Sequence, residues 1–316
     1  MNKEKVHVII AGCISTFAVL SALFAFSDFA MMAKGGTKSS EWMKNVDGNK
    51  YLSEISLPGT HDSGARYSIG DLAGKCQDAN IGSQLTFGVR FLDIRLKYNG
   101  PKDFSVIHGI VDERLDFGSV YGDCRGFLRQ HPSETIIMSV KNEDGGNKDI
   151  FAGKLEEYLT SYEDVIYMGN NIPKLEDVRG KIVIFARYRD NQIGVNLHDG
   201  WQDPSTPEHN NTFDIVRGEE TYHIQDHYSL KSAEAKWEEA KECLSYAMNN
   251  TDKNIYCINF MSGVLNGSFP PSYSVPVAKY VNKQFLKEYK NYTSMGTVLF
   301  DFVTEDLAKA VYERNF

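Results

Sequence analysis

Two histidines that each follow a short apolar run are the residues of this sequence best suited to acid–base chemistry. His61 lies in the segment SLPGTHDSGA, directly before Asp62, and His108 ends the segment SVIH. A histidine pair can supply a general base and a general acid, because the ordinary pKa of an imidazole lies near neutrality. A carboxylate beside each ring can orient it and stabilise its charged form. By itself, however, a His-Asp pair is also common in surface turns.

Charged residues also stand near the ends of other short apolar runs. Arg95 is the most informative of them, because a guanidinium carries a permanent charge and binds two phosphate oxygens at once. Two histidines, several carboxylates and an arginine fit the cleavage of a phosphodiester by acid–base catalysis, with the arginine in the role that a metal takes elsewhere. The residues at these ends are His61, Asp62, Asp93, Arg95, His108, Lys141, Arg187, Asp226 and Asp301.

Eight β-like runs that alternate with helical patterns predict the elements that must position these side chains. Strands alternating with helices indicate βα units and a parallel sheet. Eight of them suggest an α/β fold, a (β/α)8 barrel in a single domain, with some helices missing or shortened. The clearest helical pattern covers 232–249. Strands are expected at 54–57, 90–97, 104–108, 135–141, 181–187, 221–226, 254–261 and 297–303.

The alternation of side chains within the strands predicts which end of the barrel carries the site. In the strand at 90–97 one face is wholly apolar, whereas the other begins with Phe91 and becomes charged at Asp93 and Arg95. Three other strands repeat this pattern. Successive side chains of a strand point to opposite faces, so the second face should line the barrel interior and open at the carboxyl end. Barrel enzymes carry their chemistry at that end.

Six motifs, taken together and in order, resemble the bacterial phosphatidylinositol-specific phospholipase C family. They are SLPGTHDSGA, VRFLDIR, VIHG, HPSETIIMSVK, RGKIVIFARY and IQDHY. The resemblance covers 44–316 and implies a distorted (β/α)8 TIM barrel, which agrees with the alternation of side chains. It implies phosphatidylinositol in a membrane surface as the partner, cleaved to diacylglycerol and inositol 1,2-cyclic phosphate. Release of proteins from glycosyl-phosphatidylinositol anchors is a further activity that it leaves open.

The resemblance also implies a role for each residue of the predicted site. His61 would be the general base toward the inositol 2-hydroxyl, with Asp301 as its partner. His108 would be the general acid toward the diacylglycerol oxygen, assisted by Asp62. Arg95 would bind the phosphate and offset its charge. The other implied residues are Asp93, which would support the site, and Lys141, Arg187, Asp226 and Tyr228, which would hold the inositol ring.

Arg95 also bears on whether a metal takes part. Calcium-dependent relatives hold acidic ligands where this family has an arginine. Ca²⁺ needs some six or more oxygen ligands and would be repelled by a guanidinium. We therefore expect neither a metal nor a cofactor, although Asp93 and Glu143 supply carboxylates nearby.

Two functions of other classes stay open on the sequence alone. One is a metal-dependent glycerophosphodiester phosphodiesterase on a similar barrel, which would need acidic metal ligands near His61. The other is an inactive inositol-lipid-binding protein, which would have no use for the acid–base set of His61, His108 and Asp301. Sensitivity to EDTA tests the first function, and the effect of His61→Ala on the release of inositol phosphate tests the second.

The first 27 residues resemble an export segment rather than part of the fold. Lysines precede an almost uncharged apolar run, and small residues follow it, which is typical of a secretory signal peptide or of an uncleaved anchor. We expect 1–27 to be this segment and 28–43 to be a spacer. The protein would then be a secreted or extracellular monomer, or would stay attached to the membrane through an uncleaved N-terminal segment. A net charge of −8 with scattered basic residues argues against a nucleic-acid partner.

Four cysteines follow the export segment, and an even number in an exported protein permits two disulfides. The four cysteines are Cys76, Cys124, Cys243 and Cys257. We favour a disulfide between Cys76 and Cys124, and the alternative is that some of the four are free buried thiols.

An apolar loop after the seventh strand is a candidate contact with the membrane. Such a loop can dip into a bilayer at the mouth of the barrel or simply pack on the barrel. Trp201, on the loop after the fifth strand, could join this rim or cover the pocket. The apolar residues of the rim loop are Val264, Leu265, Phe269, Pro270, Pro271 and Tyr273.

Overall fold

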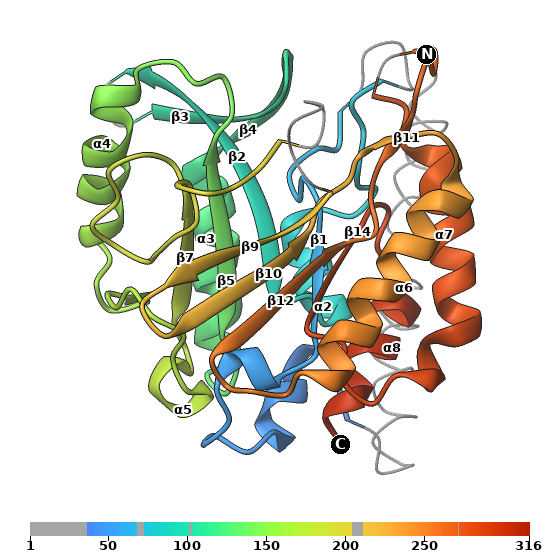
Figure 1. Cartoon of the computed structure of the whole chain (residues 1–316). Coiled ribbons are helices and arrows are strands. Elements are labelled where there is room, and N and C mark those ends of the chain that lie inside the picture. The colour runs from blue at the N-terminus through green and yellow to red at the C-terminus, as the bar shows by residue number, and fades with distance from the viewer. Residues whose placement is uncertain (1–36, 68–72, 101–102, 204–210, 271) are drawn as a thin grey trace, which may run out of the picture.

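Seven parallel strands form the wall of a barrel in the computed structural model of this chain (Figure 1). Each strand pairs in parallel with the next one in space, so their carboxyl ends open at the same mouth. In spatial order the strands are β7 (Ile182–Arg187), β5 (Ile136–Asn142), β2 (Phe91–Gly100), β1 (Leu57–Thr60), β14 (Thr297–Phe300), β12 (Ile255–Phe260) and β10 (Glu220–Gln225).

The barrel is distorted on one side, where the sheet does not close on itself. β6 (Ile166–Tyr167) and β8 (Val195–Asn196) pair with β7, whereas β9 (Thr212–Arg217) pairs antiparallel with β10. Among the described residues no strand pairing joins these two edges, and no helix lies between β7 and β10. The fold is therefore a distorted (β/α)8 barrel, as predicted, in which short strands and loops replace one helix.

Helices cover the outer face of the barrel, and several begin at side-chain caps (Figure 1). In α6 (Ala233–Asn249) the Ser232 hydroxyl accepts a hydrogen bond from the Ala235 amide, which satisfies a helix-end donor and confirms the helix predicted at 232–249. None of the described helices combines the length and apolar character needed to cross a bilayer. The others are α2 (Ile81–Phe87), α3 (Phe117–Gln130), α4 (Lys148–Thr160), α5 (Leu175–Val178), α7 (Val275–Glu288) and α8 (Glu305–Tyr312), with 3₁₀ turns at Leu52–Glu54, Tyr289–Asn291 and Glu313–Asn315.

The folded part of the chain begins earlier than predicted. The 3₁₀ helix Ser39–Asn45 places Trp42 and Met43 fully in the interior. The predicted spacer at 28–43 therefore ends in folded structure, because burying large apolar side chains stabilises the fold. The predicted export segment at 1–27 lies outside the described residues, which are 37–67, 73–100, 103–203, 211–270 and 272–316.

The two faces of the barrel strands differ as the alternation predicts. In β2, Leu92 and Ile94 belong to the core layer shared with the helices, whereas Phe91 belongs to the cluster that fills the barrel. Asp93 and Arg95 follow Phe91 on the inner face toward the mouth. Burying one Leu or Phe side chain contributes about 1.5–3 kcal/mol. A register shift of one residue is therefore strongly disfavoured, because it would turn charged side chains toward the helices.

The predicted strand at 104–108 is not part of the wall. β3 (Asp103–His108) pairs antiparallel with β2 and with β4 (Val111–Asp116). β2 continues beyond the mouth of the barrel, and β3 returns along it, so that His108 ends at the rim. The sequence did not reveal this hairpin, because side chains alternate with the same period in parallel and antiparallel strands.

The first wall strand also differs from the prediction at 54–57. β1 begins at Leu57, so it includes Pro58 and Gly59, which resemble a turn in the sequence. Gly59 is needed there, since a Cβ atom on it would lie 3.0 Å from Phe91 Cβ and 3.1 Å from Leu299 Cγ. As a consequence, His61 follows its strand directly and stands at the mouth.

The predicted disulfide between Cys76 and Cys124 is wrong. All four cysteines among the described residues are free and buried. Cys124 lies on α3 in the core beneath the helices, whereas Cys76 lines the pocket at the mouth. An even number of cysteines permits disulfides without requiring them, because a buried thiol packs like a small apolar side chain.

Candidate active site

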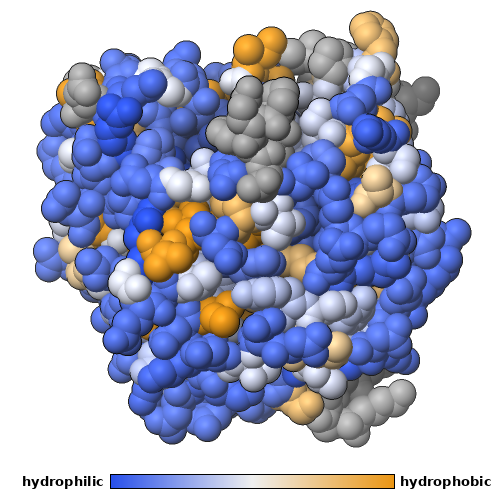
Figure 2. Space-filling model, viewed as in Figure 1, coloured by the Kyte–Doolittle hydropathy of each residue, from blue (hydrophilic) through white to orange (hydrophobic). Residues whose placement is uncertain are grey.

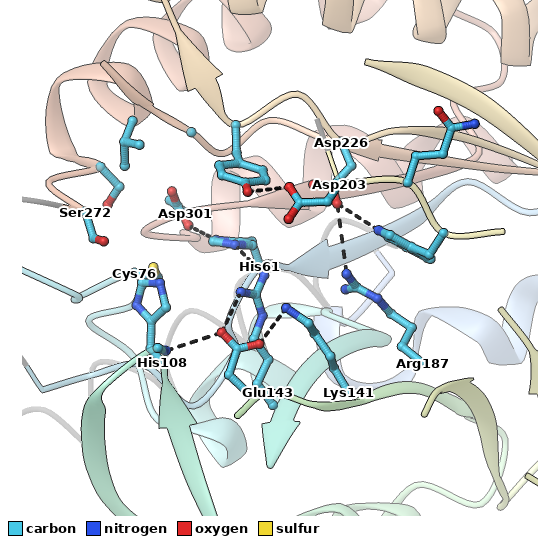
Figure 3. Close-up of a pocket in the computed structure, with 18 of the residues that line it drawn as sticks. His61, Cys76, His108, Lys141, Glu143, Arg187, Asp203, Asp226, Ser272 and Asp301 are labelled. Carbon is cyan, nitrogen blue, oxygen red and sulfur yellow. Dashed lines mark hydrogen bonds and ion pairs between the residues drawn. The ribbon is translucent and has the colours of Figure 1, made fainter. Parts of the chain in front are cut away.

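A pocket of about 430 Å³ opens at the mouth of the barrel (Figure 3). Asp62 and Asp93 contact Arg95 at its base, with a carboxylate oxygen of each within 3.2 Å of the guanidinium. All side chains of the predicted site therefore meet in one place. The predicted residues that line the pocket are His61, Arg95, His108, Lys141, Arg187, Asp226, Tyr228 and Asp301.

His61 is held from three sides. Its backbone amide donates to the Phe300 carbonyl, and its carbonyl accepts from the Gln77 side chain. Its Nδ1 lies 2.8 Å from Asp301 Oδ1, which leaves Nε2 facing the pocket. Burial lowers the pKa of His61, but the charge of Asp301 and its hydrogen bond outweigh burial, so this pKa lies above its ordinary value. The imidazole is thus oriented and made more basic by Asp301.

Arg95 is surrounded by acceptors. Its guanidinium lies 3.1 Å from Asp62, 3.2 Å from Asp93 and 3.4 Å from Glu143, and Nη2 lies 2.9 Å from His61 Nε2. Burial lowers the pKa of Arg95, but the carboxylates, Asp62 foremost, outweigh burial and raise it well above its ordinary value. Arg95 is therefore a permanent positive charge directly beside the exposed nitrogen of His61.

The Asp62 carboxylate lies between the two imidazoles and slightly nearer to His108. Its backbone takes a positive φ of 42°, which aspartate tolerates better than most residues. Its Oδ2 lies 3.4 Å from His108 Nε2 and 3.6 Å from His61 Nε2. The His108 Nδ1–H donates to the Gly74 carbonyl over 2.7 Å, which turns Nε2 toward Asp62. The two rings lie 6.4 Å apart between centroids. His61 is therefore hydrogen-bonded to Asp301, whereas Asp62 lies close to both rings and is the carboxylate nearest to His108.

The opposite wall of the pocket carries donors and acceptors suited to a polyol ring. Arg187 Nη1 lies 3.3 Å from Asp93, and Nη2 lies 4.0 Å from Asp226. Trp201 covers Arg187 with its ring, 3.7 Å from Cζ, and donates from Nε1 to Asp226. The Tyr228 hydroxyl donates a hydrogen bond to the Asp203 carboxylate. Trp201 thus forms part of the pocket wall, one of the two positions that the sequence allowed.

Comparisons with known proteins agree with this geometry. Residues 56–188 match the family model described as phosphatidylinositol-specific phospholipase C, X domain. The chain is 30% identical to the 1-phosphatidylinositol phosphodiesterase of Staphylococcus aureus (strain NCTC 8325 / PS 47), over 88% of this chain and 89% of that protein. The chain belongs to the phosphatidylinositol-specific phospholipase C family. It is also 24% identical to the enzyme of the same name from Listeria monocytogenes serovar 1/2a (strain ATCC BAA-679 / EGD-e), over 95% and 92% of the chains.

A solved structure supports the fold of this family member. The phosphatidylinositol-specific phospholipase C of S. aureus, studied for the modulation of its membrane binding, superposes with a TM-score of 0.78 at 27% identity. The match covers 88% of this chain and 98% of the other. The barrel inferred from side-chain alternation is thus the fold of a solved relative.

Glu143 is a residue of this phospholipase family site to which the sequence analysis gave no place beyond a nearby carboxylate. Its carboxylate lies 2.6 Å from Lys141 Nζ and accepts from the Gly109 amide (Figure 3). Burial raises the pKa of Glu143, but Arg95 and Lys141 outweigh burial and hold it at about 2. The sequence could have indicated Glu143 by its position two residues after Lys141, because side chains two residues apart in an extended segment point to the same face.

Lys236 is a second residue that the sequence analysis missed. It lies on α6 and is fully buried, with Nζ 2.7 Å from Gln225 Oε1 and 2.6 Å from the His227 carbonyl. Burial lowers its pKa to about 8. The sequence could have indicated that Lys236 is buried, because it lies four residues before Ala240 and therefore on the apolar face of the helix. Its ammonium group braces the segment that carries Asp226.

Two exposed apolar side chains stand on loops at the mouth. Ile110, in the turn between β3 and β4, is 95% exposed, and Phe269, after β13 (Val264–Leu265), is 91% exposed. β13 itself pairs with β11 (Ser229–Leu230), so part of the predicted rim is packed, and Pro271 lies outside the described residues. Elsewhere the face shown in Figure 2 is mainly hydrophilic, with small separate apolar groups.

Proposed function

We propose that this chain is a phosphatidylinositol-specific phospholipase C that cleaves phosphatidylinositol into diacylglycerol and inositol 1,2-cyclic phosphate. One observation carries the proposal: two imidazoles face one pocket, one held by Asp301 and the other near Asp62, and the Arg95 guanidinium contacts both His61 and Asp62. The names of the Staphylococcus and Listeria relatives, 1-phosphatidylinositol phosphodiesterase, support it. Slow hydrolysis of the cyclic product to inositol 1-phosphate could follow.

In the first half of the reaction, His61 acts as the general base. Its hydrogen bond with Asp301 presents Nε2 to the pocket. Arg95 Nη2 contacts this nitrogen, and a substrate phosphate would draw the guanidinium toward its own oxygens. Nε2 is then free to take the proton of the inositol 2-hydroxyl while the 2-oxygen attacks phosphorus. The nucleophile is already tethered beside the phosphate, so proximity lowers the barrier.

In the second half, His108 acts as the general acid. Its Nε2 gives a proton to the diacylglycerol oxygen as the bond from that oxygen to phosphorus breaks. The Gly74 carbonyl fixes the ring through Nδ1, and Asp62 lies on the reacting side. Arg95 supplies positive charge to the phosphate, so no step requires a metal.

The remaining predicted residues define the substrate. We propose that Lys141, Arg187, Asp226 and Tyr228 hold the inositol hydroxyls, because they line the wall opposite the histidines. Asp93 joins Arg95 to Arg187 and keeps the two guanidinium groups in place. Asp93 remains ionised, because the nearby guanidinium groups outweigh burial and lower its pKa. Glycosyl-phosphatidylinositol anchors carry the same ring and are a further proposed substrate.

We also propose where the enzyme works. It would act as an exported monomer that binds transiently to a membrane surface, with 1–27 as the export segment or an anchor. Ile110 and Phe269 are the described side chains best placed to enter the bilayer, since both are almost fully exposed near the mouth. A solved relative studied for its membrane binding supports this proposal.

Phosphorus NMR of the reaction with phosphatidylinositol vesicles in excess EDTA tests the function. We expect the signal of inositol 1,2-cyclic phosphate to grow in, and His61→Ala to abolish it. Activity that disappears in EDTA and returns with a divalent metal would instead identify a metal-dependent phosphodiesterase. Binding of the lipid with no turnover would identify an inactive lipid-binding protein.

A further inference from the structure

Cys76 is a buried thiol at the active-site mouth for which the proposed reaction has no use. One ligand atom from each of His61, Asp62 and Cys76 lies within 4.8 Å of the other two. Within the described part of the chain, no other group of three such residues meets this spacing. An imidazole nitrogen, a carboxylate oxygen and a thiolate sulfur together form a donor set suited to zinc.

We infer that His61, Asp62 and Cys76 form a Zn²⁺ site, and that Zn²⁺ bound there inhibits the enzyme. The inhibition rests on the proposed function, because the ion would occupy the nitrogen that takes the substrate proton. Zinc in this site is a competitor of the substrate and has no part in the reaction.

His61 is already arranged as a zinc ligand. Metal-binding histidines commonly donate their second ring N–H to a carboxylate, which fixes the ring and raises its basicity. Asp301 holds Nδ1 of His61 in this way and presents Nε2. Ligand atoms in a tetrahedral zinc site lie roughly 3.5 Å apart. The distance of 3.6 Å between His61 Nε2 and Asp62 Oδ2 already fits, and the Cys76 sulfur lies within 4.8 Å of a ligand atom of each.

The charges around the pocket favour a cation despite the presence of Arg95. Six carboxylates against three cations leave an excess of negative charge that a divalent ion would reduce. To bind at Nε2, zinc must displace the Arg95 guanidinium, which is the movement that the substrate phosphate also requires. The carboxylates are Asp62, Asp93, Glu143, Asp203, Asp226 and Asp301, and the cations are Arg95, Lys141 and Arg187.

Zinc binding at this site would release a proton from the thiol. Burial, together with the charges of Asp301 and Asp62, raises the pKa of Cys76 well above its ordinary value, so the thiol is protonated at neutral pH. A bound metal ion reverses this balance, because it stabilises the thiolate directly. The sulfur–hydrogen bond breaks, a sulfur–zinc bond forms and the proton passes to solvent.

The test compares the full-length enzyme with Cys76→Ala and with a matched control, Cys257→Ala, which removes a buried thiol from β12. Each protein is freed of metal, and its cleavage of phosphatidylinositol vesicles is measured against ZnCl₂ concentration. The rate of each protein is expressed relative to its own rate without zinc, because the Cys76 sulfur lies 3.9 Å from His108 Nδ1 and its removal can change the basal rate. Cys76→Ala should require at least about tenfold more Zn²⁺ for half-inhibition, since it lacks one of three ligands.

A second measurement does not depend on activity. Co²⁺ replaces zinc in such sites, and thiolate ligation gives it a charge-transfer band in the near ultraviolet. We expect this band for wild type and for Cys257→Ala, and its absence for Cys76→Ala. Equal zinc sensitivity of all three proteins, activation by zinc, or no band in wild type would overturn the inference. The proposed function would still stand if metal-free enzyme made the cyclic phosphate.

Discussion

The two histidines of the site are held by different parts of the fold. His61 follows β1 and pairs with Asp301 after β14, and these two wall strands are joined by four residue pairs in register. His108 ends β3 in an antiparallel hairpin outside the wall, and its Nδ1 donates to the Gly74 carbonyl. The proposed base is therefore built by the barrel, and the proposed acid is built by an addition to it.

Because of this difference, we expect that the half of the site with the proposed base, His61, and the half with the proposed acid, His108, can be changed separately. These two wall strands are buried on both faces, whereas in β4 exposed residues alternate with residues that are partly buried or, at Glu113, fully buried. The hairpin is tied to the barrel by its pairing with β2 and by the Gly109 amide, which donates to Glu143. A change in the hairpin should disturb the acid and leave the base intact.

The largest expected effect comes from removing each histidine in turn. His61→Ala and His108→Ala should each slow the cleavage of phosphatidylinositol by about 10²–10⁴-fold, the usual contribution of a general base or acid. With a nitrophenyl ester of inositol phosphate, whose leaving group needs no proton, His108→Ala should recover most of its rate. His61→Ala should stay slow. Steady-state rates with both substrates make the test.

The outcome decides whether the halves have the roles proposed for them. Circular dichroism of both variants controls for unfolding, because each ring is partly buried. If the nitrophenyl substrate rescued both variants equally, or rescued His61→Ala alone, the division into a barrel-borne base and a hairpin-borne acid would be wrong.

The sequence predicted the base half better than the acid half, for a physical reason. Period-two alternation reports which side chains share a face, so Asp93 and Arg95 were correctly placed inside the barrel. Alternation does not distinguish a parallel from an antiparallel strand, so the hairpin that bears His108 was taken for a wall strand. Its position at the mouth was nevertheless right, since β3 returns there.

Buried polar residues outside the motifs left only weak local signals in the sequence. Glu143 contacts Arg95, 48 residues away, and Lys236 contacts the His227 carbonyl, nine residues away on another segment, and these contacts depend on the fold. The free state of Cys76 also depends on tertiary position. A cysteine count alone could not place it at the pocket.

The pH dependence of activity in variants of Asp301 and Asp62 sharpens the comparison further. Asp301 raises the pKa of His61, and a base works only when unprotonated, so activity should fall as the pH drops through that raised value. Asp301→Asn removes the charge. The acidic limb of kcat/KM should therefore move to lower pH, with a loss of rate of about 10²-fold. Asp62→Asn, which leaves the partner of His61 in place, should move that limb less. An unmoved limb in Asp301→Asn would contradict the assignment of the base.

A change of Lys236 tests the part of the pocket that carries Asp226, on the wall away from the histidines. Lys236→Met should raise KM by about tenfold with a smaller change in kcat, because it removes charged hydrogen bonds that brace the segment of Asp226. Lys241→Met, on the exposed face of the same helix, is the control and should change neither value. A fall in kcat with KM unchanged would place Lys236 in the chemical step instead.

The same lysine makes a separate prediction for stability. Its folded pKa of about 8 lies below the ordinary value of 10.5, so burial of the charged form opposes folding below pH 8. This opposition fades as the pH rises from about 8 to 10.5. Wild type should therefore gain stability relative to Lys236→Met over that window in urea unfolding. A constant difference between the two proteins would contradict the lowered pKa.

The smallest expected effects compare the hairpin and the barrel at the membrane. Ile110 stands on the hairpin and Phe269 on a loop of the barrel, and both are almost fully exposed. Ile110→Ala should weaken vesicle binding by about fivefold and Phe269→Ala by about tenfold, in line with the apolar area each removes. Val216→Ala, an exposed apolar change on β9, is the control. Cosedimentation with phosphatidylinositol vesicles measures the binding. A loss confined to Phe269→Ala would mean that the barrel alone meets the membrane, and that the hairpin serves only to deliver His108.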